Sequence, residues 1–192
     1  MKKKRSLGPV TLAYPLPAFL VGSYDLDGRP NIMTAAWGGI CSSEPPCLSV
    51  SVRESRWTHH GIIKNNAFTV SIPNVGLVAE TDYAGIMPGK KDDKFTSTGL
   101  TPVRSDLVEA PYVEQCPVII ELSLYKTVEL GSHTQFIGQI MDVKVNEDCF
   151  QTGQNKPDME KINPLIFDPA GHYRSIGKII GAAFSIGMAL KK

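Results

Sequence analysis

The sequence lacks the features that would place the chain in a membrane or in an oxidising compartment. It has no uninterrupted run of the roughly eighteen apolar residues that a membrane helix needs, because the apolar segment 179–190 is shorter and contains two glycines and a serine. The four cysteines show no C-x-x-C spacing, which argues against a zinc knuckle or a thioredoxin-type pair. We therefore expect a cytoplasmic protein with reduced thiols and no membrane partner.

Signatures of metal-dependent and hydrolytic enzymes are equally scarce. No histidine lies at a recognisable ligand spacing, and the neighbours His59 and His60 would point about 100° apart on a helix. The G-x-S-x-G elbow of serine hydrolases is absent, and Gly89-Lys90-Lys91 lacks the spacing of a nucleotide-binding P-loop. The sequence thus predicts no metal site and indicates no hydrolytic nucleophile.

Positive charge is concentrated at the two ends of the chain. The formal net charge is +1, but six of the twenty basic residues are Lys2, Lys3, Lys4, Arg5, Lys191 and Lys192. The remaining fourteen basic residues face nineteen acidic ones, whereas a nucleic-acid surface needs many cations on one face. We expect no nucleic-acid partner. Three prolines, at positions 9, 15 and 17, follow the basic start and argue against a secretion signal.

The chain does contain enough apolar sequence for one core. Of its 192 residues, 42% are apolar, and neither a repeat nor a linker divides them, so we expect a single domain over residues 1–192. The sequence lacks the regular strand-helix alternation of a doubly wound sheet. It favours a mainly β fold, a Greek-key-like antiparallel barrel of roughly six or seven strands with short helical insertions.

The alternation of apolar and polar residues predicts the individual elements. Strands are expected near residues 18–24, 31–39, 48–53, 67–72, 118–130 and 135–145, with a last short strand between 164 and 176. Helices are expected at about 55–64, with Ser55 or Thr58 as N-cap, and at 76–86. Gly138 is the expected site of a β-bulge. Three further segments are interpreted as an extended connection, a charged loop and a surface excursion, at 42–46, 88–98 and 151–163.

The segment 31–37, Asn-Ile-Met-Thr-Ala-Ala-Trp, has small residues in the middle of a predicted strand. It follows the turn signal Asp27-Gly28 and would form the second arm of a β-hairpin. Ala35 and Ala36 would leave main-chain groups accessible to a planar, hydrogen-bonding ligand. The alternative is a tight barrel corner where large side chains do not fit, and these seven residues leave both interpretations open.

The junction 51–58 combines several groups that bind phosphate. It contains a strand end, Arg53 and Arg56, several hydroxyl residues and the expected start of a helix. A helix N-terminus carries about half a positive charge and has unsatisfied N–H groups, so it would hold a dianionic phosphate with help from the arginines. A capped helix with solvent-facing arginines is the alternative interpretation.

Five motifs in sequence order resemble those of the flavin reductase-like family of FMN-binding split barrels, particularly its flavoredoxin branch. They comprise residues 27–37, Pro45-Pro46, residues 51–58, Asp93-Lys94-Phe95, and residues 131–138 with Gly-Ser-His and Phe-Ile-Gly. The resemblance covers about residues 18–145. Relatives often carry Ser-Gly shortly before Asp-Lys-Phe, whereas this chain has Met87-Pro88-Gly89 and two lysines.

The resemblance implies a split β-barrel that forms homodimers and binds FMN near the subunit boundary. In the family pattern residues 31–36, in the second arm of the first hairpin, lie along the isoalloxazine ring, the junction holds the ribityl phosphate, and the Asp-Lys-Phe loop closes the site. His133, in the expected turn between the last two long strands, matches the histidine near which nicotinamide approaches the flavin, and it is the expected catalytic residue. The implied cofactor-binding residues are Asn31, Met33, Thr34, Ala35, Ala36, Ser51, Val52, Arg53, Thr58, Lys94 and Phe95.

The expected function is that of an FMN-binding oxidoreductase. It would take hydride from NADH or NADPH and pass electrons to free flavin or to a redox protein, with the flavin supplying the reactivity. One alternative is a flavoredoxin-type electron carrier that does not turn over nicotinamides. Another is a non-catalytic module that stores flavin.

Overall fold

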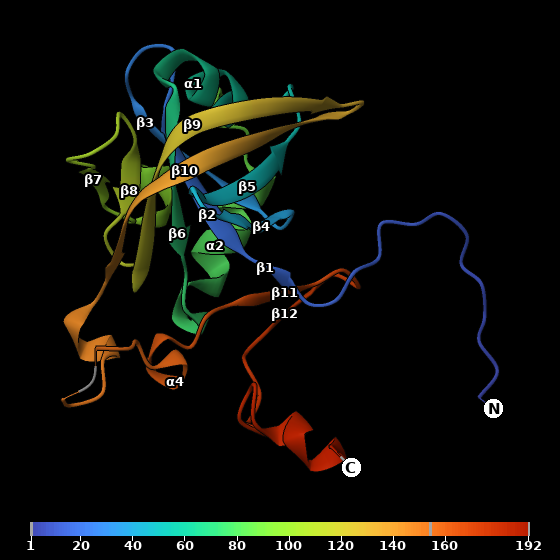
Figure 1. The fold of residues 1–192 in the computed structure, drawn as a ribbon. Helices are drawn as coiled ribbons and strands as arrows, with labels where there is room; N and C mark the ends of the chain where they lie inside the picture. The colour runs from blue at the N-terminus through green and yellow to red at the C-terminus, as the bar shows by residue number, and fades with distance from the viewer. Residues whose placement is uncertain (1, 154, 192) are drawn as a thin grey trace.

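The computed structural model describes residues 2–153 and 155–191, and its largest element is a seven-stranded antiparallel sheet (Figure 1). The strand order is β3-β2-β6-β9-β10-β5-β4. The strands are β2 Phe19–Tyr24, β3 Pro30–Ala35, β4 Gly38–Ser43, β5 Pro46–Val52, β6 Ala67–Ile72, β9 Val118–Leu130 and β10 His133–Val145. The predicted mainly β, antiparallel architecture is confirmed.

The two edge strands of this sheet, β3 and β4, are consecutive in the chain. Only Ala36 and Trp37 join them, so the sheet must curl until its two edges meet. β3 approaches β5 at this point but does not pair with it. The barrel is therefore split along the line between β3 and β5, which leaves one edge of β3 free of strand partners.

Two smaller sheets and four short α-helices complete the described fold. β1 Leu16–Pro17 pairs with β11 Ile166–Asp168, which pairs with β12 His172–Arg174, while β7 Pro102–Arg104 pairs with β8 Pro111–Val113. The helices are α1 Trp57–Asn65, α2 Val78–Ile86, α3 Lys94–Thr98 and α4 Met159–Ile162, and the 3-10 turns are η1 Val75–Leu77, η2 Glu147–Cys149 and η3 Ile186–Leu190.

Several expectations about local structure were wrong. Segment 88–98 is not all loop, because Asp93 accepts a hydrogen bond from the Thr96 N–H and starts α3. Neither Ser55 nor Thr58 caps α1, whose N-cap position is Arg56, without a side-chain cap. The segment 151–163 is a surface excursion as expected, but it also contains α4, with Gln154 outside the described residues. The single strand expected between 164 and 176 is two strands, β11 and β12.

The strand expected over 31–39 is also interrupted, because the chain leaves β3 after Ala35 and starts β4 at Gly38. Segment 42–46 is not merely an extended connection, since it ends β4 and begins β5. Glycine is required at position 38, where a Cβ atom would lie 2.6 Å from the Ser49 carbonyl oxygen. This close approach lets β4 pair with β5 directly after a two-residue corner.

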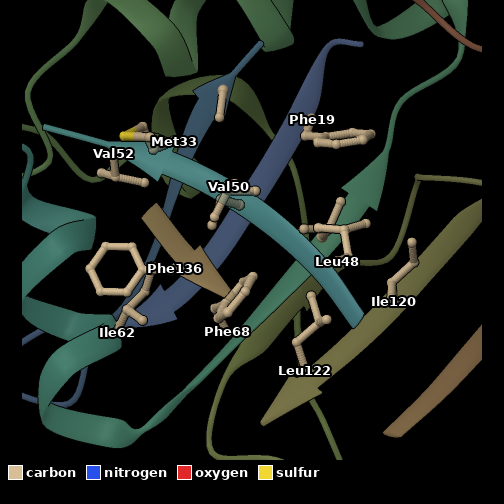
Figure 2. Close-up of a cluster of buried hydrophobic side chains, with 13 residues drawn as sticks. Phe19, Met33, Leu48, Val50, Val52, Ile62, Phe68, Ile120, Leu122 and Phe136 are labelled. Atoms are coloured by element: carbon tan, nitrogen blue, oxygen red, sulfur yellow. The ribbon is translucent and has the colours of Figure 1, made fainter. Parts of the chain in front are cut away.

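The barrel interior is filled by one cluster of apolar side chains from the sheet and α1 (Figure 2). Phe68 and Phe136 are fully buried there, and burial of such a side chain stabilises the fold by about 1.5–3 kcal/mol. The predicted bulge at Gly138 is confirmed by a register shift against β9. A Cβ atom at Gly138 would lie 2.8 Å from both the Phe68 ring and the Leu122 Cβ atom, so the strand bends where two core side chains occupy its inner face.

Both ends of the chain extend away from the barrel (Figure 1). Residues 2–15 and 177–191 are exposed and are anchored where β1, β11 and β12 pair. The second of these arms carries six large exposed apolar side chains, among them Ile180 and Phe184, which are 95% and 105% exposed. Among the described residues no helix is long and apolar enough to cross a membrane.

Candidate functional site

The split between β3 and β5 contains a cavity of about 230 Å³. Its walls come from the end of β3, the corner before β4, the end of β5 and the start of β10. The lining residues are Met33, Thr34, Ala35, Ala36, Trp37, Ser51, Val52, Arg53, Arg56 and His133. Eight of the twelve residues expected at the cofactor or in catalysis are in this set.

The free edge of β3 supplies main-chain hydrogen-bonding groups to the split. The Ile32 carbonyl faces that edge, because it accepts a hydrogen bond from Lys94 and not from β2. Main-chain groups of alternate residues in an antiparallel strand point the same way, so Thr34 presents its N–H and C=O at the same edge. The Thr34 hydroxyl is already used, since it donates to the Thr81 carbonyl in α2.

The small residues of β3 both pack the core and shape the cavity. Met33 and Ala35 are 5% and 6% exposed and belong to the barrel cluster, yet both line the split. Ala36 lies at the corner and is half-buried. The two interpretations of this segment are therefore compatible: a side chain larger than alanine at position 35 would press on the core and also fill the slot.

A second cavity, of about 460 Å³, lies over the start of α1. It is lined by Met33, Arg53, Ser55, Arg56, Trp57, Thr58, Met87, Pro88, Gly89, Lys90 and Lys94. Because no side chain caps α1, the partial positive charge of its N-terminus is not offset there. Arg53 and Arg56 add two exposed guanidinium groups to the same place. The cavity thus combines the groups that bind a phosphate.

Asn31 and Thr58 connect β3 to α1 beneath this cavity. The Asn31 amide donates to the Thr58 hydroxyl over 2.7 Å, and both side chains are buried. A Cβ atom at Gly89 would lie 2.2 Å from the Asn31 amide oxygen, so the 87–90 loop approaches Asn31 closely. Asn31 and Phe95 themselves line a separate cavity of about 590 Å³, which the structure does not bring to the split.

The buried side chain of Lys94 links β3 to α2. Its ammonium group donates to the carbonyls of Ile32 and Ala84, each over 2.8 Å, and the residue is 4% exposed. Ala84 lies in the last turn of α2, where a cation is favoured by the helix dipole. Burial, together with the positive charge of Arg56, lowers the pKa of Lys94 from 10.5 to about 8. The lysine thus positions β3 against α2.

His133 lies at the open end of the split and is not in a turn, because it is the first residue of β10. Its Nδ1 atom lies 2.9 Å from the Ser132 hydroxyl, and its ring centroid lies 4.9 Å from that of Trp37. Burial and the charge of Arg53 lower the pKa of His133 below the ordinary 6.5. The imidazole is therefore mainly neutral at pH 7.

The two cavities are neighbours that share three lining residues, Met33, Arg53 and Arg56. Together they bring ten of the twelve expected site residues to one cleft, with Asn31 and Phe95 behind it. The cleft residues that were not among the twelve expected ones are Trp37, Ser55, Arg56, Trp57, Met87, Pro88, Gly89 and Lys90. Ser55, Arg56 and Trp57 lie in the junction 51–58 that was interpreted as a phosphate site, whereas no local signal assigned the 87–90 loop to that site.

The residues present fit a flavin nucleotide in shape and charge. A narrow slot with small side chains and free main-chain groups leads into a cationic helix start. Comparison with known families agrees, because residues 11–177 match the flavin reductase like domain. The chain belongs to the flavin reductase-like family. The split barrel described above is the fold that the resemblance implied.

Individual members of the flavin reductase-like family cover most of this chain. The flavoredoxin of Desulfovibrio vulgaris (Miyazaki F) is 52% identical, with a TM-score of 0.91 over 96% of this chain and 100% of that one. The flavoredoxin from Methanosarcina acetivorans is 31% identical, with a TM-score of 0.87 over 99% of each chain. A ferric-chelate reductase (NAD(P)H) of Archaeoglobus fulgidus is 26% identical over 109 residues, which are 56% of this chain and 63% of that protein.

Proposed function

We propose that the protein is an FMN-dependent oxidoreductase that accepts hydride from NADH or NADPH and passes electrons to free flavin or to a redox protein. The observation that carries the proposal is that the two cavities are neighbours, with Met33, Arg53 and Arg56 in the walls of both. FMN has the matching shape, because its planar ring is joined to a phosphate by a flexible chain. The name of one relative, a ferric-chelate reductase (NAD(P)H), supports the same activity.

In this proposal the chain holds FMN by its two ends. The Thr34 main chain would bond the polar edge of the ring against Met33, Ala35 and Ala36. The start of α1, with Ser51, Val52, Arg53 and Thr58, would hold the ribityl phosphate, while Asn31, Lys94 and Phe95 support that wall from behind. FMN supplies the hydride and electron chemistry when bound, and the protein supplies position and electrostatics.

His133 has the position of a catalytic residue in this arrangement. It lies where β10 begins, at the open end of the slot, so that a nicotinamide entering from solvent would pass its ring. Because Nδ1 faces Ser132, the other ring nitrogen is available to a bound ligand. A neutral imidazole there would align the incoming nicotinamide ring by a hydrogen bond. Because it carries no positive charge, it would not compete with Arg53 and Arg56 for the phosphate.

A flavoredoxin-type electron carrier is the second candidate, and the 52% identity to a flavoredoxin favours it specifically. Such a carrier would use the same cleft and exchange electrons with a redox protein without turning over nicotinamides. A storage module would bind flavin and do neither. The three functions share the binding site and differ only in what reduces the bound flavin.

Anaerobic mixing of the yellow protein with each reductant tests these functions. Rapid bleaching of the flavin colour by NADH or NADPH is the result expected of a reductase. The variant Arg104→Ala, which alters an exposed ion pair far from the cleft, serves as a control for nonspecific effects. Bleaching only by a reduced redox protein would replace the reductase by the carrier, and a sample that binds no FMN at all would overturn the proposal.

We also propose a cytoplasmic homodimer in which the two exposed arms contact a second copy of the chain. The apolar arm residues Ile180 and Phe184 are almost fully exposed, and η3 buries none of its residues. A short 3-10 helix gains little stability by itself, so a surface from another molecule explains its order better.

All four cysteines are free and three are buried, which supports a reducing compartment and hence the proposed cytoplasmic location.

Replacing Ile180 and Phe184 together by aspartate tests the role of the arms. The protein should change from dimer to monomer in light scattering, because the charges would be buried without partners. The matched control is Leu107→Asp, which also places a charge at an exposed apolar position but lies outside both arms. A wild-type protein that is monomeric at micromolar concentration would refute the dimer.

A further inference from the structure

Trp37 is fixed in the corner between β3 and β4 by its main chain. Its carbonyl accepts a hydrogen bond from the Ser51 N–H over 2.8 Å, and the next residue, Gly38, pairs with Val50. The indole itself is 39% exposed and forms part of the wall of the slot. The backbone therefore places this large ring at a defined point above the end of β5.

His133 reaches the same point from the other side of β5. The sheet order is β10-β5-β4, and the residue after His133, Thr134, pairs with Val52. Both rings thus lie over the end of one central strand, with centroids 4.9 Å apart and planes inclined by 38°. This distance is within the range in which aromatic rings attract each other. Trp37 therefore restricts the rotation of the imidazole on its exposed side.

The remaining surroundings of His133 restrict it on other sides. Ser132 faces its Nδ1 atom, while Arg53 from the end of β5 lines the cavities on both sides of the imidazole. The other charged groups around these cavities are Arg56, Glu54 and Glu129. In the described part of the chain no protein atom is hydrogen-bonded to the His133 Nε2 atom, which remains for a ligand.

We propose that Trp37 is a positioning residue, which holds the His133 ring so that Nε2 is presented to the flavin cleft while Ser132 retains Nδ1. That this orientation serves reduction of the flavin rests on the function proposed above; the orientation itself does not. The indole acts through the imidazole by packing and touches no reacting atom in this role. This role explains why Trp37 is a large, partly exposed side chain beside the slot and not part of the core.

Nuclear magnetic resonance of the histidine ring tests the orientation directly, in the flavin-loaded protein and after flavin removal. The His133 signals are identified by their loss in His133→Gln. In the wild type the ring protons should be shifted upfield by the indole, and the nitrogen shifts should show one predominant tautomer. Trp37→Leu should abolish the upfield shift and mix the tautomers, whereas Trp37→Phe should retain most of both. Unchanged His133 signals in a folded Trp37→Leu protein would overturn the proposal.

Reduction kinetics give the second measurement. Trp37→Leu should slow reduction by NADH or NADPH by about 10-fold to 100-fold, the range expected when a reacting group is misplaced by an ångström, with FMN affinity changed far less. Trp37→Phe should recover most of the rate, and Tyr125→Leu, which removes an exposed aromatic ring elsewhere, should have no effect. Equal losses of rate and FMN affinity would make Trp37 a wall for the flavin and refute the positioning role. A wild type that neither nucleotide reduces would refute the proposed function, while the ring signals still decide the role of Trp37.

Discussion

The two halves of the cleft are built in different ways. The slot consists of strand main chain and side chains from β3 and β5, which do not pair with each other and approach only because the sheet curls into a barrel. The cationic half consists mainly of one local junction, residues 53–58, with the 87–90 loop over it. The slot should therefore be sensitive to added volume, and the cationic half to lost charge. Substitutions aimed mainly at one half should distinguish the two.

Ala35→Leu should have the largest effect on flavin binding. The added side chain would occupy the slot, so we expect loss of FMN binding, with a stability cost of about 1–3 kcal/mol from overpacking. Ala67→Leu is a matched control, because Ala67 is also a buried alanine of the sheet, 4% exposed, and lies outside both cavities. Titration with FMN and chemical denaturation separate the two effects. Retained FMN affinity in folded Ala35→Leu would show that the slot does not hold the ring.

Lys94→Met should weaken the support beneath the slot. The carbonyls of Ile32 and Ala84 would lose their partner, which costs about 1–3 kcal/mol for each unsatisfied group. The folded protein releases the Lys94 proton near pH 8, before the unfolded chain does near pH 10.5. The wild type should therefore gain stability over the variant as pH rises through that window, by up to about 3 kcal/mol.

Denaturation of wild type and Lys94→Met at pH 7 and pH 10 checks this dependence. Lys91→Met is the control, because it removes an exposed lysine from the loop that precedes α3. If the difference in free energy of unfolding between wild type and Lys94→Met shrank as pH rises, the fold would favour the charged form of Lys94. That result would contradict the lowered pKa of Lys94.

Arg53→Ala should weaken the cationic half. If Arg53 donates a charge-assisted hydrogen bond to the phosphate, FMN affinity should fall by about 1.5–3 kcal/mol. Riboflavin lacks the phosphate, so its affinity should hardly change. Comparison of the two ligands by fluorescence quenching therefore assigns the loss to the phosphate end. An equal loss for both ligands would instead place Arg53 against the ring.

His133→Ala should have the smallest effect on binding and should distinguish catalysis from retention of the cofactor. The residue lies at the open end of the slot, so FMN affinity should stay close to that of the wild type while reduction by nicotinamide slows. Stopped-flow mixing measures the rate, and titration measures the affinity. Unchanged reduction in the variant would remove His133 from the catalytic assignment.

The sequence predicted most of the barrel because its strands carry local signals. The alternation in β5 and the turn signal Asp27-Gly28 are readable without tertiary information, and the resemblance placed ten site residues that the structure brings to one cleft. The β4 strand was missed because its two neighbouring prolines suggested an extended connection. Its pairing depends on the contact between Gly38 and Ser49, which is formed only in the closed sheet.

The remaining errors have a similar physical origin. Lys94 reads as a loop lysine, but its burial depends on two carbonyls, from β3 and α2, that only the tertiary fold brings together. Thr58 reads as a helix cap, but its hydroxyl is taken by Asn31, which is 27 residues away. Short motifs thus identified which residues gather at the site, whereas the role of each depended on partners distant in sequence.

Gly138 has a consequence for how this protein would tolerate variation. The Phe68 ring and the Leu122 side chain leave room only for a hydrogen atom on the inner face of β10. In a library that samples every amino acid at every position, we expect this position to accept almost no replacement, even though it lies outside the cleft and takes no part in chemistry. A glycine at this position should therefore identify the split barrel in distant homologues more reliably than the residues that contact the ligand.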